Sequence, residues 1–336
     1  MRFYVGTLTR LGGPGLVSCR IEGDRLMQEA ADASLVDPNY LIFDKALRRL
    51  YAVSANAGEG TMKGSVTAWR LTENGLVFLG RQSTGGNGAC HLTLCPDGRF
   101  LYAANYATGS LAAFPVTEEG LGPRLQLIIH RGRGPHPTRQ AGPHVHQVTF
   151  LPWANILCAV DLGTDGLVLY AQDIKTGLLS PYGTFRFAPG LGPRHVAYGR
   201  DDTAYVVHEL GNAVSVLKWA SGKFALLQTL STLPEGFAGE NTAAAIRLSP
   251  EGTALYVSNR GHDSIAAFRV EKDGCLAPLG FFPSGGGFPR DFILLADGRI
   301  LAANQQSGVA LLSPAPERRV LASLPIPGAV CVCPVC

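Results

Sequence analysis

Residues 101–105 (LYAAN) are one copy of a short phrase that recurs along this chain: an apolar run ending in a polar residue, followed by a Gly-rich turn. The other copies are 3–7 (FYVGT), 50–54 (LYAVS), 157–161 (LCAVD), 204–208 (AYVVH), 255–259 (LYVSN) and 300–304 (ILAAN). Successive copies start 47, 51, 56, 47, 51 and 45 residues apart. A unit of about that length, built from short strands, is the period of a β-propeller blade. The sequence therefore predicts an all-β, seven-bladed propeller.

A blade needs four strands, and the residues around each copy supply the other three. An apolar run precedes the copy and often ends at a tight turn, as residues 91–95 do before 96–98 (PDG). A third run follows, for example 109–114, and a fourth lies beyond the next turn, for example 177–182. Period-two alternation with closely spaced turn signals predicts strands. Labelled A to D from the channel outward, the A strands are expected near residues 40, 90, 145, 195, 244, 291 and 330.

The two ends of the chain are predicted to share one blade. The N-terminus starts directly with a B strand, so one A strand is missing there. Residues 328–334 (GAVCVCP) supply it, because they echo the A-strand stretch 88–96 (GACHLTLCP). This pairing closes the ring and removes the exposed edges of an open sheet. The sequence thus predicts a single propeller domain over residues 1–336.

The composition fits this fold and argues against other classes of protein. Apolar residues make up 46% of the 336 residues and charged residues 16%, as expected for strands buried on both faces. The net charge of +3 comes without a dense Lys/Arg run, so nucleic acid is not an expected partner. Apolar runs stay shorter than the roughly 20 residues of a membrane helix. A strand pattern by Phe3 leaves no room for a secretory signal, which predicts a soluble, cytoplasmic protein away from membranes.

The cysteines give no sign of a disulfide framework or of a metal site. They lie at positions 19, 90, 95, 158, 275, 331, 333 and 336, without the spacing of a disulfide scaffold, which agrees with a reducing compartment. The tail Cys331–Cys336 resembles half of a metal knuckle but lacks the second pair of ligands that structural zinc needs. Ordinary strand and tail cysteines are expected, with no bound metal.

Unusual polar residues cluster where A strands start and B strands end. Strands of a blade run up and down, so these two places lie on the same face of the ring. The A-strand starts carry residues 90–91, 143–146, 193–195, 239–241 and 289–290, and the B-strand ends carry residues 105–106, 161, 208–209, 259–260 and 304–305. A ring of His, Arg, Glu and Asn side chains at one mouth of the channel is therefore predicted, and a concave mouth with converging polar groups is the expected site.

These polar stretches resemble a known family over nearly the whole chain. The matching motifs are Arg139-Gln140, 143–146 (PHVH), 161–163 (DLG), 190–195 (GLGPRH), Glu209-Leu210, 239–241 (GEN), 258–265 (SNRGHDSI) and 303–305 (ANQ). They look like those of the lactonase-type seven-bladed propellers, which include bacterial 6-phosphogluconolactonase and fungal carboxy-muconate lactonizing enzymes. The resemblance implies a site without metal or other cofactor, in which His, Arg and Glu handle a lactone or an acyclic acid. One departure is His208, where Asn is expected before Glu-Leu.

His144 and His146 flank Val145 in an A strand, so strand alternation predicts that both point to the same side. A histidine pair can bind metal, make structural hydrogen bonds, or serve as acid, base or substrate contact, and these alternatives stay open. His146 lies deeper along the strand and is the preferred catalytic residue, since histidine exchanges protons near neutral pH. His144 and His195 are candidate substrate contacts.

Glu209 ends a strand among apolar residues, so partial burial is expected to raise its pKa and make it a general base. The alternative is a carboxylate paired with a nearby arginine. Arg194, Arg260 and Arg290 come from consecutive blades and suit phosphate or carboxylate binding, and Arg194 could stabilise an oxyanion. The candidates for orienting sugar hydroxyls, or for tying turns, are Asn241, Asn259 and Gln305.

Three functions follow from these residues and from the resemblance. The first is a lactonase that hydrolyses 6-phosphogluconolactone to 6-phosphogluconate in the pentose phosphate pathway. The second is a cycloisomerase that closes a muconate-like acid into a lactone. The third is a non-catalytic propeller that binds a protein partner, because fold alone does not fix function. In the first two, the ligand is a small anionic sugar lactone or carboxylate. The oligomeric state is not predicted.

Overall fold

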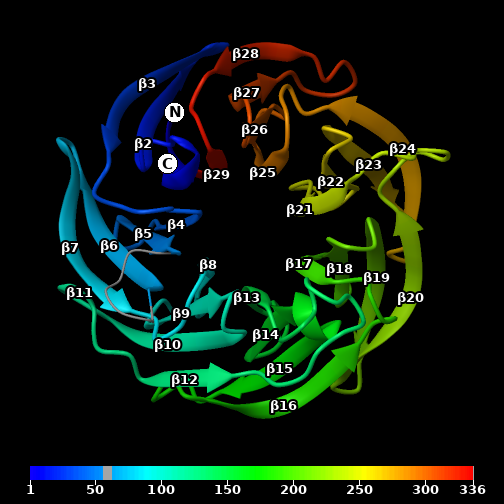
Figure 1. Cartoon of the computed structure of the whole chain (residues 1–336), viewed down its shortest axis with the longest axis horizontal. Helices are drawn as coiled ribbons and strands as arrows, with labels where there is room; N and C mark the ends of the chain where they lie inside the picture. Colours follow the sequence, from blue (N-terminus) through cyan, green and yellow to red (C-terminus); the bar gives the residue numbers. More distant parts are fainter. Residues whose placement is uncertain (56–62, 336) are drawn as a thin grey trace.

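The computed structural model describes residues 1–55 and 63–335, which form seven sheets arranged in a ring (Figure 1). Blade 1 joins β29 (Ala329–Pro334) to β1 (Arg2–Thr7), β2 (Leu16–Glu22) and β3 (Arg25–Asp32). Blade 2 contains β4 (Tyr40–Asp44), β5 (Arg49–Ser54), β6 (Ser65–Thr72) and β7 (Gly75–Ser83). Blade 3 contains β8 (Ala89–Leu94), β9 (Phe100–Asn105), β10 (Ser110–Thr117), β11 (Gly120–Leu121) and β12 (Gln126–Ile129). Both β11 and β12 pair with β10.

The remaining blades follow the same up-and-down order. Blade 4 contains β13 (Val145–Phe150), β14 (Ile156–Asp161), β15 (Gly166–Gln172) and β16 (Leu179–Arg186). Blade 5 contains β17 (Pro193–Tyr198), β18 (Thr203–His208), β19 (Ala213–Ala220) and β20 (Lys223–Ser231). Blade 6 contains β21 (Thr242–Leu248), β22 (Ala254–Arg260), β23 (Ser264–Val270) and β24 (Leu276–Pro283). Blade 7 contains β25 (Pro289–Leu294), β26 (Ile300–Asn304), β27 (Gly308–Leu312) and β28 (Val320–Leu324). Each recurring phrase is the second strand of its blade, as predicted.

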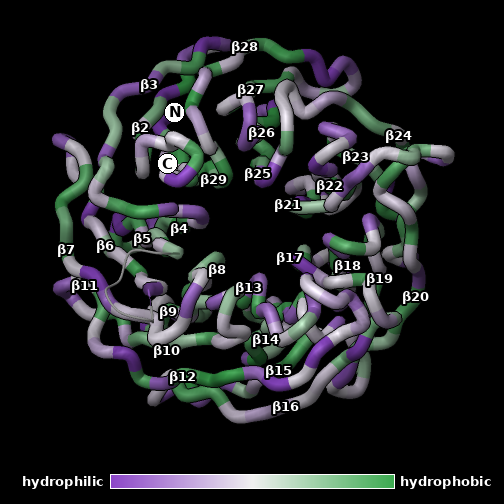
Figure 2. Tube along the Cα trace, viewed as in Figure 1, coloured by the Kyte–Doolittle hydropathy of each residue, from purple (hydrophilic) through white to green (hydrophobic). Residues whose placement is uncertain are grey.

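The hydrophobic core lies between neighbouring blades. One buried cluster joins Tyr102 of blade 3 to Val148 and Phe150 of blade 4, and similar clusters fill the other interfaces around the ring. Apolar stretches accordingly recur in every part of the ring (Figure 2). The second strands are buried on both faces, which explains their near-continuous apolar sequences. A single blade could not bury these faces, so the ring folds as one body.

The C-terminal strand closes the ring, as the sequence predicts. β29 pairs with β1 in an antiparallel ladder that places Val5 opposite Val332. Just before β29, the Gly328 carbonyl accepts a hydrogen bond from the Leu8 amide at 2.8 Å. Cys331 and Cys333 pack into the apolar cluster between blades 1 and 2. Cys336 lies outside the described residues.

Bulges interrupt six of the seven inner strands near their starts. The pairing register shifts between Ala89 and His91 in β8, and equivalent shifts occur in β13, β17, β21, β25 and β29. A bulge leaves one residue unpaired and re-aims its side chain. The residues set between the shifted pairs in four of these strands are Cys90, His146, Arg194 and Arg290. The polar groups of the mouth are therefore placed by a repeated backbone irregularity.

Two short 3₁₀ turns, η1 (Thr9–Leu11) and η2 (Leu162–Thr164), are the helical elements of the described residues. Neither is long and apolar enough to cross a membrane, and the same holds for every helix in residues 1–55 and 63–335.

Candidate active site

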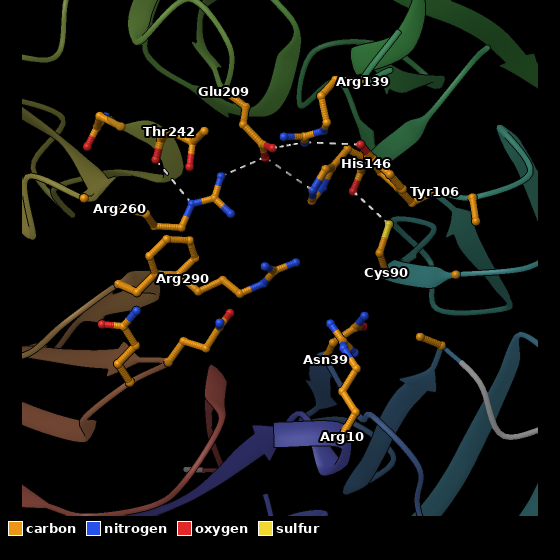
Figure 3. Close-up of a pocket in the computed structure, with 18 of the residues that line it drawn as sticks. Arg10, Asn39, Cys90, Tyr106, Arg139, His146, Glu209, Thr242, Arg260 and Arg290 are labelled. Carbon is orange, nitrogen blue, oxygen red and sulfur yellow. Dashed lines mark hydrogen bonds and ion pairs between the residues drawn. The ribbon is translucent and has the colours of Figure 1, made fainter. Parts of the chain in front are cut away.

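A cavity of about 1330 Å³ opens at the mouth of the channel, where the A strands start (Figure 3). Residues from every blade line it. The predicted site residues on its wall are His146, Glu209, Asn241, Arg260, Arg290 and Gln305. The fold thus brings together side chains that are up to 159 positions apart in the sequence.

Glu209 lies at the centre of the polar network. Its amide donates to the Gly192 carbonyl just after β18, and its side chain is almost fully buried. Arg260 Nη2 lies 2.9 Å from its Oε2 atom, and Arg139 donates to its Oε1 atom (Figure 3). Arg194 Nε lies 3.0 Å from the same Oε2 atom. Three guanidinium groups from three blades therefore share one carboxylate.

The expected rise in the pKa of Glu209 is wrong. Burial by itself would raise this pKa, but the charges of Arg260, Arg194 and Arg139, with His146, outweigh burial and hold it well below its ordinary value. The alternative left open by the sequence, a carboxylate paired with arginine, is what the structure contains. Glu209 stays ionised at neutral pH and has a low affinity for protons.

His146 faces this carboxylate as a neutral imidazole. Its Nε2 atom lies 3.9 Å from Glu209 Oε2, and its buried Nδ1 atom has no hydrogen-bond partner among the described residues. Burial lowers the pKa of His146 well below its ordinary value, the Arg194 charge adds to this effect, and Glu209 opposes it. An uncharged imidazole can accept a proton from a reacting group, and the ionised Glu209 partly offsets the effects of burial and of Arg194 on the resulting cation.

The two histidines of the PHVH motif do not share one role. The bulge at His146 breaks the alternation from which a common orientation was predicted. His144 stacks on the Tyr106 ring with centroids 4.4 Å apart and donates from Nδ1 to the Tyr106 carbonyl at 2.8 Å. His144 is not among the residues that line the cavity, so its contacts support Tyr106, and substrate contact by His144 stays a prediction.

Arg194 and His195 lie below the main cavity, in a narrower recess that also touches Tyr40 and Asp291. Arg194 Nη1 donates to the Ala244 carbonyl at 2.8 Å while its Nε faces Glu209. Burial, with repulsion from Arg260, lowers the pKa of Arg194 to about 9. Because Arg194 lines this recess and not the main cavity, and its Nε faces Glu209, it fits the positioning of Glu209 better than contact with substrate.

The asparagines tie turns together, which was the alternative to substrate contact. Asn259 is fully buried, donates to the Thr232 carbonyl at 2.6 Å and accepts from the Thr232 hydroxyl at 3.0 Å. Asn241 lines the cavity, yet its amide donates to Asn212 Oδ1 at 2.8 Å and accepts from the His262 amide at 3.1 Å. Gln305 lies on the cavity wall directly after β26.

Several lining residues were not identified as site residues from the sequence. Arg139 belongs to the long loop between β12 and β13, and Arg10 belongs to η1, so neither occupies a repeated strand position. Arg10 forms an ion pair of 2.8 Å with Asp37. Asn39, Cys90 and Tyr106 lie beside A-strand starts or B-strand ends, and this position could have identified them as lining residues from the sequence. Arg10 has no such position.

The cavity wall carries more positive than negative charge. Its cations are Arg10, Lys63, Arg139, Arg260 and Arg290, and its carboxylates are Glu209, Glu240 and Asp263. A concave surface with surplus positive charge concentrates anions. The chemistry of the mouth therefore suits an anionic small molecule.

Comparison with known proteins identifies the family of this chain. Residues 2–332 match the family described as Lactonase, 7-bladed beta-propeller. The chain belongs to the lactonase propeller family. It is 36% identical to the 6-phosphogluconolactonase of Bacillus subtilis over 319 residues, which cover 92% of this chain and 89% of that protein.

Solved structures of similar propellers superpose closely on this lactonase propeller. The periplasmic gluconolactonase of Pseudomonas aeruginosa aligns with a TM-score of 0.90 and 29% identity, covering 98% of each chain. A protein from Lactobacillus plantarum aligns with a TM-score of 0.89 and 29% identity, again over 98% of each chain. Within residues 1–55 and 63–335, no group of three His, Cys, Asp or Glu side chains is arranged to hold a metal ion.

Four buried histidines are expected to make the fold sensitive to acid. Burial lowers the pKa of His91, His146 and His195 well below the ordinary value and that of His208 to about 3. Below pH 6.5 the unfolded chain binds protons at these sites that the folded chain does not, so the free energy of unfolding falls as pH falls. Each histidine contributes at most about 1.4 kcal/mol per pH unit. Denaturant unfolding at pH 7.5 and 5 should show a loss of several kcal/mol.

His208→Asn provides the matched control for this acid sensitivity. His208 Nε2 contacts the Ser215 hydroxyl at 2.7 Å, a hydrogen bond that an asparagine amide can replace without titrating. The variant should lose about a quarter of the pH dependence, since one of the four groups is removed. Equal unfolding free energies for the wild type at both pH values would contradict the interpretation.

Proposed function

We propose that this lactonase hydrolyses 6-phosphogluconolactone to 6-phosphogluconate. This hydrolysis is a step of the pentose phosphate pathway. The observation that carries the proposal is the Glu209–His146 pair facing a cavity with surplus arginine charge. The names of the Bacillus and Pseudomonas proteins support lactone chemistry on a gluconate skeleton. We also propose a cytoplasmic location, because the spacing of the cysteines lacks the pattern of a disulfide scaffold.

In the proposed reaction, His146 acts as the base. Its neutral Nε2 accepts a proton from a water molecule, whose oxygen forms a bond to the lactone carbonyl carbon. Glu209 Oε2, 3.9 Å from that nitrogen, stabilises the imidazolium. The bond from this carbon to the ring oxygen then breaks, and the ring oxygen takes the proton from His146 to become a hydroxyl. The acid product loses a proton to solvent.

Arg260 is the best placed donor for the negative charge that develops on the carbonyl oxygen. Its Nε and Nη2 atoms are held by the Thr242 and Ala243 carbonyls, and Nη2 also contacts Glu209. Its Nη1 makes no hydrogen bond within residues 1–55 and 63–335. A donor fixed in this way needs no reorganisation during the reaction, and one such donor contributes roughly 3–4 kcal/mol.

A rate measurement tests the proposal directly. Freshly prepared 6-phosphogluconolactone is mixed with the protein, and the appearance of acid is corrected for spontaneous hydrolysis. A carboxy-muconate is assayed in parallel, because a cycloisomerase would use the same cations to hold carboxylates. A rate above the spontaneous one with the phosphorylated lactone supports the proposal. Turnover of the muconate alone favours the cycloisomerase, and no turnover of either favours the binding scaffold.

The pH dependence of turnover is expected to be flat between pH 8 and 6. Because the pKa of His146 lies well below its ordinary value, the neutral form that accepts the proton persists at pH 6. A histidine with the ordinary pKa of about 6.5 would lose roughly three-quarters of its neutral form there. Initial rates at saturating lactone, with far-ultraviolet circular dichroism to confirm folding at each pH, provide the measurement. A fourfold fall by pH 6 would remove His146 as the base.

A further inference from the structure

Arg290 differs from the other arginines of the cavity because its guanidinium group is unpaired. Arg10 pairs with Asp37, and Arg139 and Arg260 both pair with Glu209. Arg290 makes neither a hydrogen bond nor an ion pair within residues 1–55 and 63–335. The bulge at the start of β25 re-aims its side chain, which extends into the middle of the cavity (Figure 3).

The cavity has two chemically different walls. The wall built from blades 3 to 6 contains Tyr106, His146 and Glu209, with the arginines that surround the carboxylate. Arg290, Arg10 and Asn39 come from blades 7, 1 and 2 and point into the cavity from the other side in Figure 3. Asn39 also lines this wall; its buried Oδ1 atom has no hydrogen-bond partner among the described residues but can only accept, so the Nδ2 group is the part of this side chain that could donate to an anion. The second wall therefore offers hydrogen-bonding groups and no carboxylate within the cavity.

We propose that Arg290, Arg10 and Asn39 form a subsite for a phosphate monoester, opposite the Glu209–His146 pair. This inference rests on the proposed function and deepens it, because it sets the direction in which the substrate binds. The 6-phosphate occupies the Arg290 wall, and the lactone carbonyl faces His146 and Arg260.

Charge and geometry favour phosphate on the Arg290 wall. A guanidinium group binds phosphate oxygens through two parallel hydrogen bonds, and an unpaired one has both donors available. Burial lowers the pKa of Arg290 to about 10, and the charges of Arg260 and Arg10 add to this effect. A dianion bound between Arg290 and Arg10 would remove that repulsion. Near Glu209, in contrast, the ionised carboxylate would repel it.

The separation of Arg260 from Arg290 supports two distinct anion-stabilising positions. The Arg260 guanidinium lies over the Phe288 ring, 5.4 Å from its centroid, and is fixed by the Thr242 and Ala243 carbonyls. It is therefore held toward Glu209 and cannot swing to join Arg290. One arginine is committed to the reacting end of the substrate and the other to the phosphorylated end.

The test compares two lactones that differ only in phosphate. Steady-state rates are measured with 6-phosphogluconolactone and with glucono-δ-lactone for the wild type, Arg290→Gln and Arg290→Lys. The ratio of the two kcat/KM values is expected to fall at least 30-fold in Arg290→Gln and to recover partly in Arg290→Lys. Arg269→Gln is the matched control and should keep the wild-type ratio, because Arg269 is an exposed arginine of β23 that pairs with Glu271. An unchanged ratio in Arg290→Gln would overturn the subsite.

Calorimetric titration with inorganic phosphate separates failure of this subsite from failure of the proposed function. If the wild type hydrolyses neither lactone, the proposed function fails, while phosphate binding that is lost in Arg290→Gln still supports the subsite. Absence of phosphate binding to the wild type overturns the subsite. Gluconate serves as the carboxylate probe. If the wild type binds gluconate as tightly as it binds inorganic phosphate, the phosphate subsite is also overturned. Melting temperatures within a few degrees of the wild type confirm that each variant is folded.

Discussion

Glu209→Gln is expected to lower turnover of 6-phosphogluconolactone by at least 100-fold. The amide keeps the shape of the side chain but cannot stabilise an imidazolium at His146, whose Nε2 lies 3.9 Å from Oε2. The neutral amide also leaves the positive charges of Arg139, Arg194 and Arg260 without their shared counter-charge. Loss of electrostatic stabilisation of this kind typically costs two to three orders of magnitude in rate. The measurement is kcat at saturating lactone, corrected for spontaneous hydrolysis.

Glu240→Gln is the control for this substitution. Glu240 is an exposed carboxylate on the wall of the same cavity, so the exchange removes an equal charge without touching the arginine cluster. It should change turnover by less than about threefold, in line with the small effect of surface substitutions. The Glu209→Gln exchange will lower the melting temperature because buried cations lose their partner, so circular dichroism must show a folded protein at the assay temperature. Near-normal turnover of folded Glu209→Gln would exclude Glu209 from the mechanism.

Deletion of residues 327–336 is expected to abolish cooperative folding or to cause aggregation. The deletion removes β29, which leaves the hydrogen-bonding groups of β1 exposed along one edge. It also removes Val332 from the cluster between blades 7 and 1, and Cys331 and Cys333 from the cluster between blades 1 and 2. Burial of a valine such as Val332 contributes about 1.5–3 kcal/mol. Together with the lost pairing of β1 and the two buried cysteines, this loss is a large fraction of the stability of about 5–15 kcal/mol of a typical domain.

Removal of Cys336 alone is the matched control, because it leaves β29 intact. Size-exclusion chromatography and thermal melting should show a soluble protein with a cooperative transition for this control, and neither for the ten-residue deletion. A ten-residue deletion with an unchanged melting temperature would contradict the contribution of β29 to stability.

The fold was predictable because the apolar run that recurs seven times in the sequence is the second strand of each blade, which is buried on both faces. The matching phrase at residues 328–334 was enough to predict ring closure, since only one blade lacked an inner strand. The polarity of strand ends predicted the mouth at which the cavity lies, without any knowledge of side-chain contacts. These features depend on periodicity, which survives in a single sequence.

The details of the site depend on interactions that periodicity does not encode. The alternation of side chains along a strand predicted that His144 and His146 point to the same side. The bulge in β13 breaks this alternation, and His144 instead contacts the Tyr106 carbonyl. The direction of the pKa shift of Glu209 depended on how many arginines reach it. One of them, Arg139, comes from a loop whose path no strand pattern specifies.

The repeated bulges create a set of equivalent side-chain positions at the mouth of the ring. Cys90, His146, Arg194 and Arg290 each occupy the same structural position in a different blade, and Val330 occupies it in β29. A residue outside the paired register can be exchanged while the ladder bonds on either side of it persist. New reactivity could therefore arise, by evolution or by design, through substitution of single bulged residues while the rest of the propeller stays unchanged.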